Sequence, residues 1–225
     1  MALRARLPDD TIKGAFVMNI IFNEKSNRRR IVEALKEKCR NSKYQMAIIS
    51  MNDVKSKRRI QQIMISSLYH GESPSIIQEI LKDVNRDFKD FHLSNIIIKA
   101  LLTNEGIPKT KIDRTLFWDD QVSYFELHYL LGTDKEYDEN LFTSIERKLM
   151  GRMSILSQSS APYIIKQVDK MKLQYMVRKN LLDAGLEEAL VADKESQRYL
   201  GRPRPVDSLL FSQSGFVIYD NNAMF

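Results

Sequence analysis

The sequence predicts a mainly α fold of the α+β class: a small N-terminal strand–helix–strand–helix element, a multi-helix domain, and a C-terminal β-hairpin. Three observations support this prediction. Short runs of β-branched residues alternate with amphipathic stretches at the start of the chain. Later segments carry apolar residues at helical spacing, separated by proline and glycine. With 43% hydrophobic residues among 225, the chain can bury a core, and its one cysteine excludes an intramolecular disulfide framework.

The N-terminal region, residues 1–71, is expected to hold two strands and two helices. Ala15–Phe22 and Tyr44–Ser50 are short runs of β-branched and aromatic residues bounded by polar ones, which is typical of strands. Asn27–Arg40 places its apolar residues on one face and therefore predicts an amphipathic helix. Ser56–Tyr69 also has apolar residues at helical spacing, so a second helix is expected there.

A helical domain is expected over residues 72–201. Ser73 is a good N-cap and Pro74 suits the first helical position, so a helix should run from there to about Phe88. The further helices predicted are Leu93–Asn104, Lys111–Leu131, Asp138–Leu156, Pro162–Asp183 and Leu186–Leu200.

The last region, residues 202–225, is expected to be an extended linker and a hairpin. Arg202–Pro205 contains two prolines and cannot continue a helix, so it favours the polyproline conformation. Leu209–Phe211 and Phe216–Tyr219 are apolar runs that flank Ser212–Gly215 and together predict a hairpin.

Charge is distributed unevenly along the chain. The net charge is +9 over residues 1–60, −6 over residues 61–141 and +3 over residues 142–225. A concentrated positive potential attracts polyanions, most often nucleic acid. The alternative is an ordinary solvated surface, on which salt screens the repulsion between neighbouring cations.

A local repeat suggests where a polyanion would bind. Met18–Ile31 (MNIIFNEKSNRRRI) and Met46–Ile60 (MAIISMNDVKSKRRI) both run from an apolar strand through Asn and an acid to a basic cluster that is expected to open a helix. Cations are unfavourable at a helix start, and a bound phosphate would remove the conflict. The predicted nucleic-acid contacts are Arg28, Arg29, Arg30, Lys57, Arg58 and Arg59, supported by Lys36, Arg40, Lys43 and Lys55.

Catalytic motifs are not found. The sequence has no Walker A loop, GxGxxG, HExxH, CxxC or GxSxG, so no catalytic residue, metal site, cofactor or small-molecule ligand is predicted. Glu126 and His128 are two residues apart, which would place both on one face of a strand but on different faces of a helix. No catalytic role is predicted for either residue.

We therefore expect a non-enzymatic protein that binds RNA or DNA through phosphate contacts and can self-associate. The alternative is a helical adaptor or a structural subunit of a larger protein assembly. The first residues lack the pattern of a signal peptide, and no apolar run is long enough to span a membrane. An intracellular location, cytoplasmic or nuclear, is expected.

Overall fold

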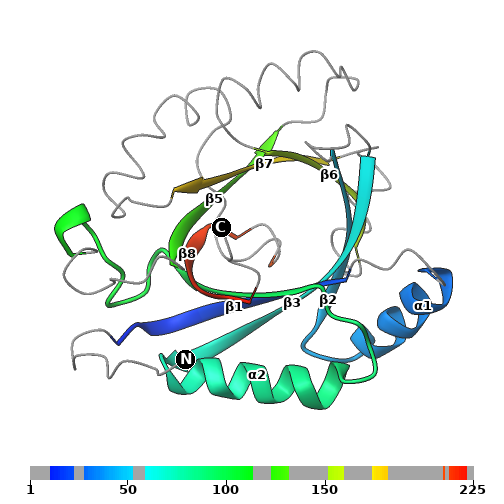
Figure 1. Ribbon diagram of the computed structural model, residues 1–225, viewed down its shortest axis with the longest axis horizontal. Coiled ribbons are helices and arrows are strands. Elements are labelled where there is room, and N and C mark those ends of the chain that lie inside the picture. Colours follow the sequence, from blue (N-terminus) through cyan, green and yellow to red (C-terminus); the bar gives the residue numbers. More distant parts are fainter. Residues whose placement is uncertain are drawn as a thin grey trace.

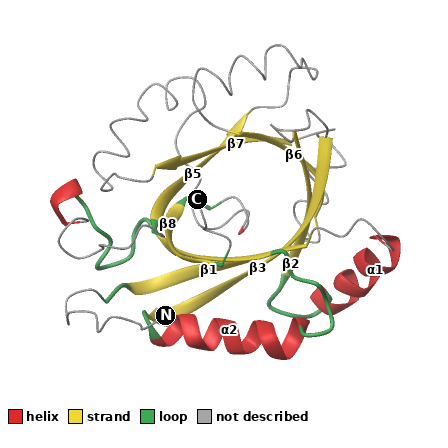
Figure 2. Cartoon of the chain, viewed as in Figure 1, coloured by secondary structure: helices red, strands yellow, loops and turns green. Residues whose placement is uncertain are grey.

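Figure 1 shows a computed structural model of the chain, which describes residues 11–22, 28–52, 59–113, 123–131, 152–159, 174–181, 210 and 213–221. Strands dominate this part of the molecule (Figure 2). The strands are β1 (Lys13–Phe22), β2 (Gln45–Asn52), β3 (Arg59–Glu72), β4 (Asn95–Leu101), β5 (Tyr124–Leu131), β6 (Arg152–Ser159), β7 (Gln174–Leu181) and β8 (Gly215–Asp220), and the helices are α1 (Arg28–Cys39) and α2 (Ser75–Phe88).

The strands form one curled antiparallel sheet that closes into a barrel. Its order is β1-β3-β2-β6-β7-β5-β8-β4, and β4 pairs in turn with β1. Each strand of the described part therefore has a neighbour on both sides.

The barrel consists of two halves with the same strand arrangement. In the first half the chain runs β1-α1-β2-β3-α2-β4 with the strand order β4-β1-β3-β2, which is the ferredoxin-like arrangement. The second half, β5 to β8, has the matching order β8-β5-β7-β6. Equivalent strands meet at the two seams, because β4 pairs with β8 and β2 pairs with β6. This one sheet includes strands from all three of the predicted regions.

Helices α1 and α2 lie outside the barrel (Figure 1). The buried stripe of α2, which includes Ile80 and Phe88, packs in one hydrophobic core with Phe16 and Met18 of β1. Because side chains alternate across a strand, the residues between these core positions, such as Asn19, point into the barrel. The same alternation defines the inner face of the other strands whose side chains are described.

The prediction of a mainly α fold is wrong, and so is the description of the protein as helical. The segment predicted as a helix over Ser56–Tyr69 contributes β3, and Leu93–Asn104 contributes β4. Each segment contains a short apolar run, Ile63–Ile65 in β3 and Ile96–Ile98 in β4, with buried residues on both faces of the strand. A short buried strand of this kind cannot be distinguished from a buried helix by its periodicity.

Four more predictions need correction: three helices and the C-terminal hairpin. β5 occupies the end of the predicted helix Lys111–Leu131, and β7 lies within the predicted helix Pro162–Asp183. β6 overlaps the end of Asp138–Leu156, whose first part lies outside the described residues, as do Leu186–Leu200 and Arg202–Pro205. The strand predicted at Phe216–Tyr219 exists as β8, but it pairs with β4 and β5 and not in a C-terminal hairpin.

The remaining elements are confirmed. Strands at Ala15–Phe22 and Tyr44–Ser50 are present as β1 and β2, and the helices predicted at Asn27–Arg40 and after Pro74 are present as α1 and α2. In the part of the chain that the structure describes, no helix has the length and apolar content needed to cross a membrane.

Candidate functional site

The basic residues predicted to bind phosphate do not form two matching helix starts. Arg28, Arg29 and Arg30 do open α1, and the side chains of Arg29 and Arg30 are exposed. Arg59, however, is the first residue of β3 and pairs with Asn52 of β2, so the second helix of the repeat does not exist. Lys55, Lys57 and Arg58 lie outside the described residues.

The supporting cations of α1 and the loop after it already have acidic partners. Lys36 lies 3.0 Å from Glu33, and Arg40 lies 2.9 Å from Glu37, each one turn along the helix. Lys43 forms an ion pair with Asp83 of α2. These three cations are therefore less available to an external anion than the sequence suggested.

The structure instead brings together three ionisable side chains in the barrel interior: Lys99, Glu126 and His128. Lys99 Nζ lies 2.8 Å from Glu126 Oε1, and His128 Nε2 lies 2.5 Å from the same oxygen. Lys99 Nζ and His128 Nε2 are 3.4 Å apart. The side chains are 0%, 2% and 9% exposed, respectively.

Three neighbouring strands position this cluster. Lys99 is on β4 in the first half, and Glu126 and His128 are alternate residues of β5 in the second half, so both face the same side of the sheet. Strand β8 lies between β4 and β5 and presents Gly215 opposite Glu126. The Lys99 side chain can cross β8 because Gly215 has no side chain: a Cβ there would lie 3.2 Å from Lys99 Cβ and 3.3 Å from its Cδ.

The residue before β8 contributes a further support. The backbone N–H of His128 donates a hydrogen bond to Ser214 Oγ at 2.9 Å. Two residues from Glu126 on the same face of β5, Tyr124 donates a hydrogen bond from its hydroxyl to Asp220 Oδ2 at 3.0 Å. The inner face of β5 is thus lined by polar side chains whose partners come from β4, β8 and the segment that leads into β8.

The arrangement is suited to acid–base chemistry. A buried charge costs several kcal/mol to desolvate, so charges at this depth are retained only when they are paired. Here one carboxylate oxygen accepts hydrogen bonds from both an ammonium and an imidazole. A base held in place by a third group is the usual organisation of a proton-transfer centre.

A second polar network, on the outside of the barrel, has a structural role. Tyr44 donates to Asp87 Oδ2 at 2.6 Å, and Tyr69 of β3 donates to Asp83 Oδ2 at 3.2 Å. The hydrogen bond from Arg86 lowers the pKa of Asp87 to about 2; burial opposes this shift, and the Tyr44 hydrogen bond adds to it. These contacts connect α2 to the sheet and to the loop before β2.

Sequence reasoning identified the spacing of Glu126 and His128 but predicted no catalytic role for either residue, and it expected a helix over Lys111–Leu131. A strand assignment for that segment would have put them on one face. Lys99 offered no signal, since its contact with Glu126 depends on how β4, β8 and β5 align. Among the described residues no group of three or more His, Cys, Asp or Glu side chains could hold a metal ion.

Comparison with known proteins yields little. No protein family matches the chain, and no curated protein matches it. A solved structure of an anthrone oxidase-like protein aligns over 92% of this chain and 92% of its own, with 6% sequence identity and a TM-score of 0.29. A likeness at that level supports no conclusion about function.

Proposed function

We propose that the protein acts on a small molecule by proton transfer, with Lys99, Glu126 and His128 as its acid–base centre. The observation that carries this proposal is the convergence of three ionisable side chains, none more than 9% exposed, inside the barrel. Apolar residues in place of a buried ion pair are often neutral or stabilising, so stability alone does not account for such a cluster. Coupled ionisable groups in a buried setting are typical of functional sites.

Glu126 determines which ring nitrogen of His128 exchanges protons. Because Glu126 Oε1 is 2.5 Å from Nε2, we assign the Nε2 proton to the hydrogen bond with the carboxylate, and a further proton is taken up at Nδ1. Lys99 provides the positive charge that compensates Glu126. When His128 accepts a proton from a ligand, the cluster gains a positive charge and the ligand a negative one. These opposite charges attract strongly in a low-dielectric interior.

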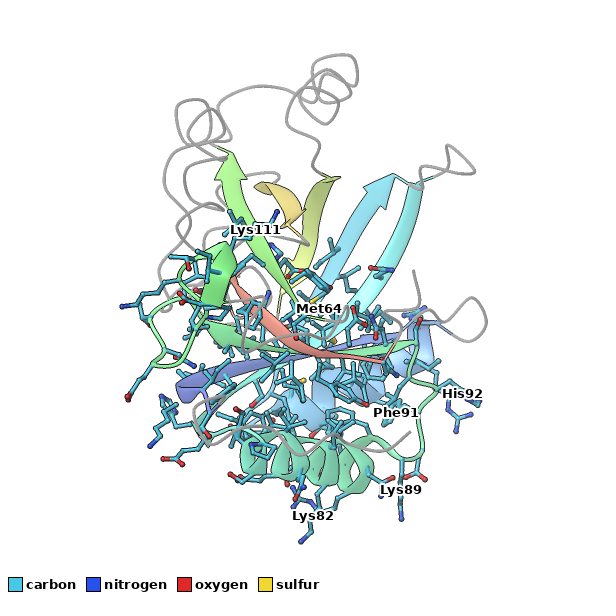
Figure 3. All side chains as sticks on the ribbon, turned by 60° about the vertical axis from the view of Figure 1, so that its left-hand side comes forward. Met64, Lys82, Lys89, Phe91, His92 and Lys111 are labelled. Carbon is cyan, nitrogen blue, oxygen red and sulfur yellow. The ribbon has the colours of Figure 1, made fainter. Side chains whose placement is uncertain are left out.

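Hydrogen–deuterium exchange measures this chemistry directly. In D₂O the wild-type protein should accelerate exchange of the α-hydrogens of one or more members of a panel of small ketones and α-keto acids. His128→Gln should lower the rate by about 10²- to 10⁴-fold. His92→Gln is the matched control, because His92 is exposed at the surface (Figure 3). Equal exchange by folded wild-type and His128→Gln proteins would contradict the proposal.

A second candidate function is the binding of nucleic acid through the outer basic surface. Arg29 and Arg30 support it, because they are exposed at the start of a helix whose first turn has no acidic residue. The N–H groups and the dipole of a helix start attract anions, and the two guanidinium groups add to that attraction. An acidic partner protein would use the same surface, which corresponds to the adaptor alternative.

Fluorescence anisotropy with a labelled oligonucleotide tests this candidate. Arg29→Ala with Arg30→Ala should weaken binding at low salt and reduce the slope of log K against log salt by about 0.7–0.9 for each phosphate that is no longer neutralised. The control is Lys82→Ala with Lys89→Ala, since Lys82 of α2 and Lys89, the residue after α2, are exposed on the side away from the barrel (Figure 3). Absence of binding at low salt would rule out nucleic acid and leave the acidic partner to be tested by competition with a polyanion.

A further inference from the structure

The inner face of the first half carries a row of uncharged polar side chains on three adjacent strands. Asn19 of β1 is opposite Ser66 of β3, and Ser66 is opposite Gln45 of β2. All three alternate with residues that pack against the helices outside the barrel, so they point inward. A row of amide and hydroxyl groups thus crosses three strands of the inner face.

The hydrogen bonds of this row are incomplete. Ser66 donates from Oγ to Asn19 Oδ1 at 2.6 Å, and these two residues are 0% and 2% exposed, respectively. Gln45 Oε1 is also buried, but no donor reaches it in the part of the chain that the structure describes. A buried acceptor without a donor is unfavourable, and such groups call for an explanation such as a ligand.

One end of the row, Asn19, lies next to the strand that carries Lys99. Asn19 is opposite Ile97 of β4, and Lys99 is the next residue on the same face of that strand. The neighbouring inward residues of these two strands, Val17 of β1 and Leu101 of β4, are apolar and pack with Leu210. The inner face of the first half thus carries hydrogen-bond acceptors. The ionisable groups lie on β4 and β5, where the first half meets the second.

We propose that Asn19, Ser66 and Gln45 form a recognition subsite for the molecule on which His128 acts, and that this molecule carries a neutral N–H or O–H donor, such as a carboxamide. This inference rests on the proposed function. Gln45 Oε1 accepts from the donor, and Asn19 Oδ1 has a second lone pair for the same group. A charged amine is disfavoured because none of these three uncharged side chains would compensate its buried charge, and a carboxylate has no proton to donate.

Acetamide and acetate test the proposal as a matched pair, since they have similar shapes and only acetamide donates N–H bonds. Side-chain amide and imidazole NMR signals are followed as each compound is added to the full-length protein. Acetamide should shift the signals of Gln45 and Asn19, and acetate should not. In Gln45→Met, which keeps the length of the side chain but removes the acceptor, the Asn19 shift should fall at least severalfold.

The outcomes separate this inference from the proposed function. Shifts confined to His128 would overturn the subsite and leave the acid–base centre standing. Shifts confined to Gln45 and Asn19, together with no H128Q effect on proton exchange, would support a binding subsite and count against proton transfer. A Gln45→Met protein that melts several degrees below wild type would show that Gln45 has a structural partner, and an absence of any shift with acetamide would likewise overturn the subsite.

Discussion

Lys99 links the two halves of the barrel through a single side chain. It extends from β4 across β8 to Glu126 on β5, and its side chain is completely buried. Its aliphatic part packs over Gly215, and its ammonium lies against a carboxylate and an imidazole. At the residue scale, the geometry of the acid–base centre therefore depends on the length of the Lys99 side chain and on the absence of a side chain at Gly215.

Lys99→Met should destabilise the protein because it leaves the Glu126 carboxylate buried without its cation. The expected loss in the free energy of unfolding is about 3–5 kcal/mol. Lys99→Met combined with Glu126→Met should recover a large part of that loss, because both charges are then absent. Urea denaturation of the three proteins measures the effect. A single substitution as stable as wild type would mean that the pair is not formed.

Gly215→Ala should distort the same contact. An added Cβ would lie 2.7 Å from the Ala100 carbonyl oxygen, which belongs to the backbone and cannot turn aside. We expect a loss of about 1–3 kcal/mol and a disturbed His128 imidazole signal. Gly71→Ala on β3 is the matched control, since its nearest neighbour would be the flexible tip of Ile76 at 3.1 Å. Equal costs for the two substitutions would argue against a specific role for Gly215.

At the scale of elements, β3 and β4 show how far local pattern determines structure here. Strands β1 and β2 and helices α1 and α2 follow from local composition and were predicted. Segments such as Ile63–Ile65 of β3 carry apolar residues on both faces, because α2 covers one side and the barrel encloses the other. This pattern has no period that distinguishes a strand from a helix. Whether the segment forms a strand therefore depends on the strands and the helix that pack against it. The candidate site was missed for the same reason, since only a strand puts Glu126 and His128 on one face.

The attachment of α2 should depend on pH through Asp87. Its folded-state pKa of about 2 lies below the ordinary value of 3.8, so its contribution is present above pH 4 and is lost as the pH falls toward 2. A shift of that size corresponds to roughly 2 kcal/mol, less a discount because the side chain is 21% exposed.

Asp87→Asn should therefore lower the free energy of unfolding by about 1–2 kcal/mol at pH 6, with the difference from wild type shrinking below pH 4. Urea denaturation over this pH range measures it. Asp90→Asn, at an exposed position just after α2, is the control. A difference that stays constant from pH 6 to pH 2.5 would show that the Asp87 carboxylate does not carry the effect.

At the scale of the whole molecule, the sheet closes because strand β8 fills the place between β4 and β5. Strand β8 pairs with β4 of the first half along most of its length, and its residues Gly215–Val217 pair with β5 of the second half. A closed sheet leaves no unpaired backbone edge in the described strands, and exposed edges are the usual route to association between β proteins. Any self-association of the intact protein is then expected to use side-chain charge and to weaken with salt.

Val217→Pro should open the barrel at this point. Proline cannot donate a backbone hydrogen bond, and Val217 lies opposite both Lys99 and Tyr124 in a strand with neighbours on both sides. Loss of β8 would expose the edges of β4 and β5. Light scattering should then show oligomers that persist at high salt, in contrast to the wild-type protein. A monomeric Val217→Pro protein at every concentration would contradict this account.

The seams between the halves also determine when the barrel can close during folding. Within the first half, neighbouring strands pair over short or moderate sequence distances, whereas Ile48 pairs with Gln158 and Lys99 with Val217, more than a hundred residues along the chain. Contacts this distant form late, because a long loop must first be ordered. Until then each half has two open edges that match those of the other half. Two chains that refold side by side at high concentration are therefore expected to exchange halves, giving long-lived dimers in which each barrel is built from two molecules.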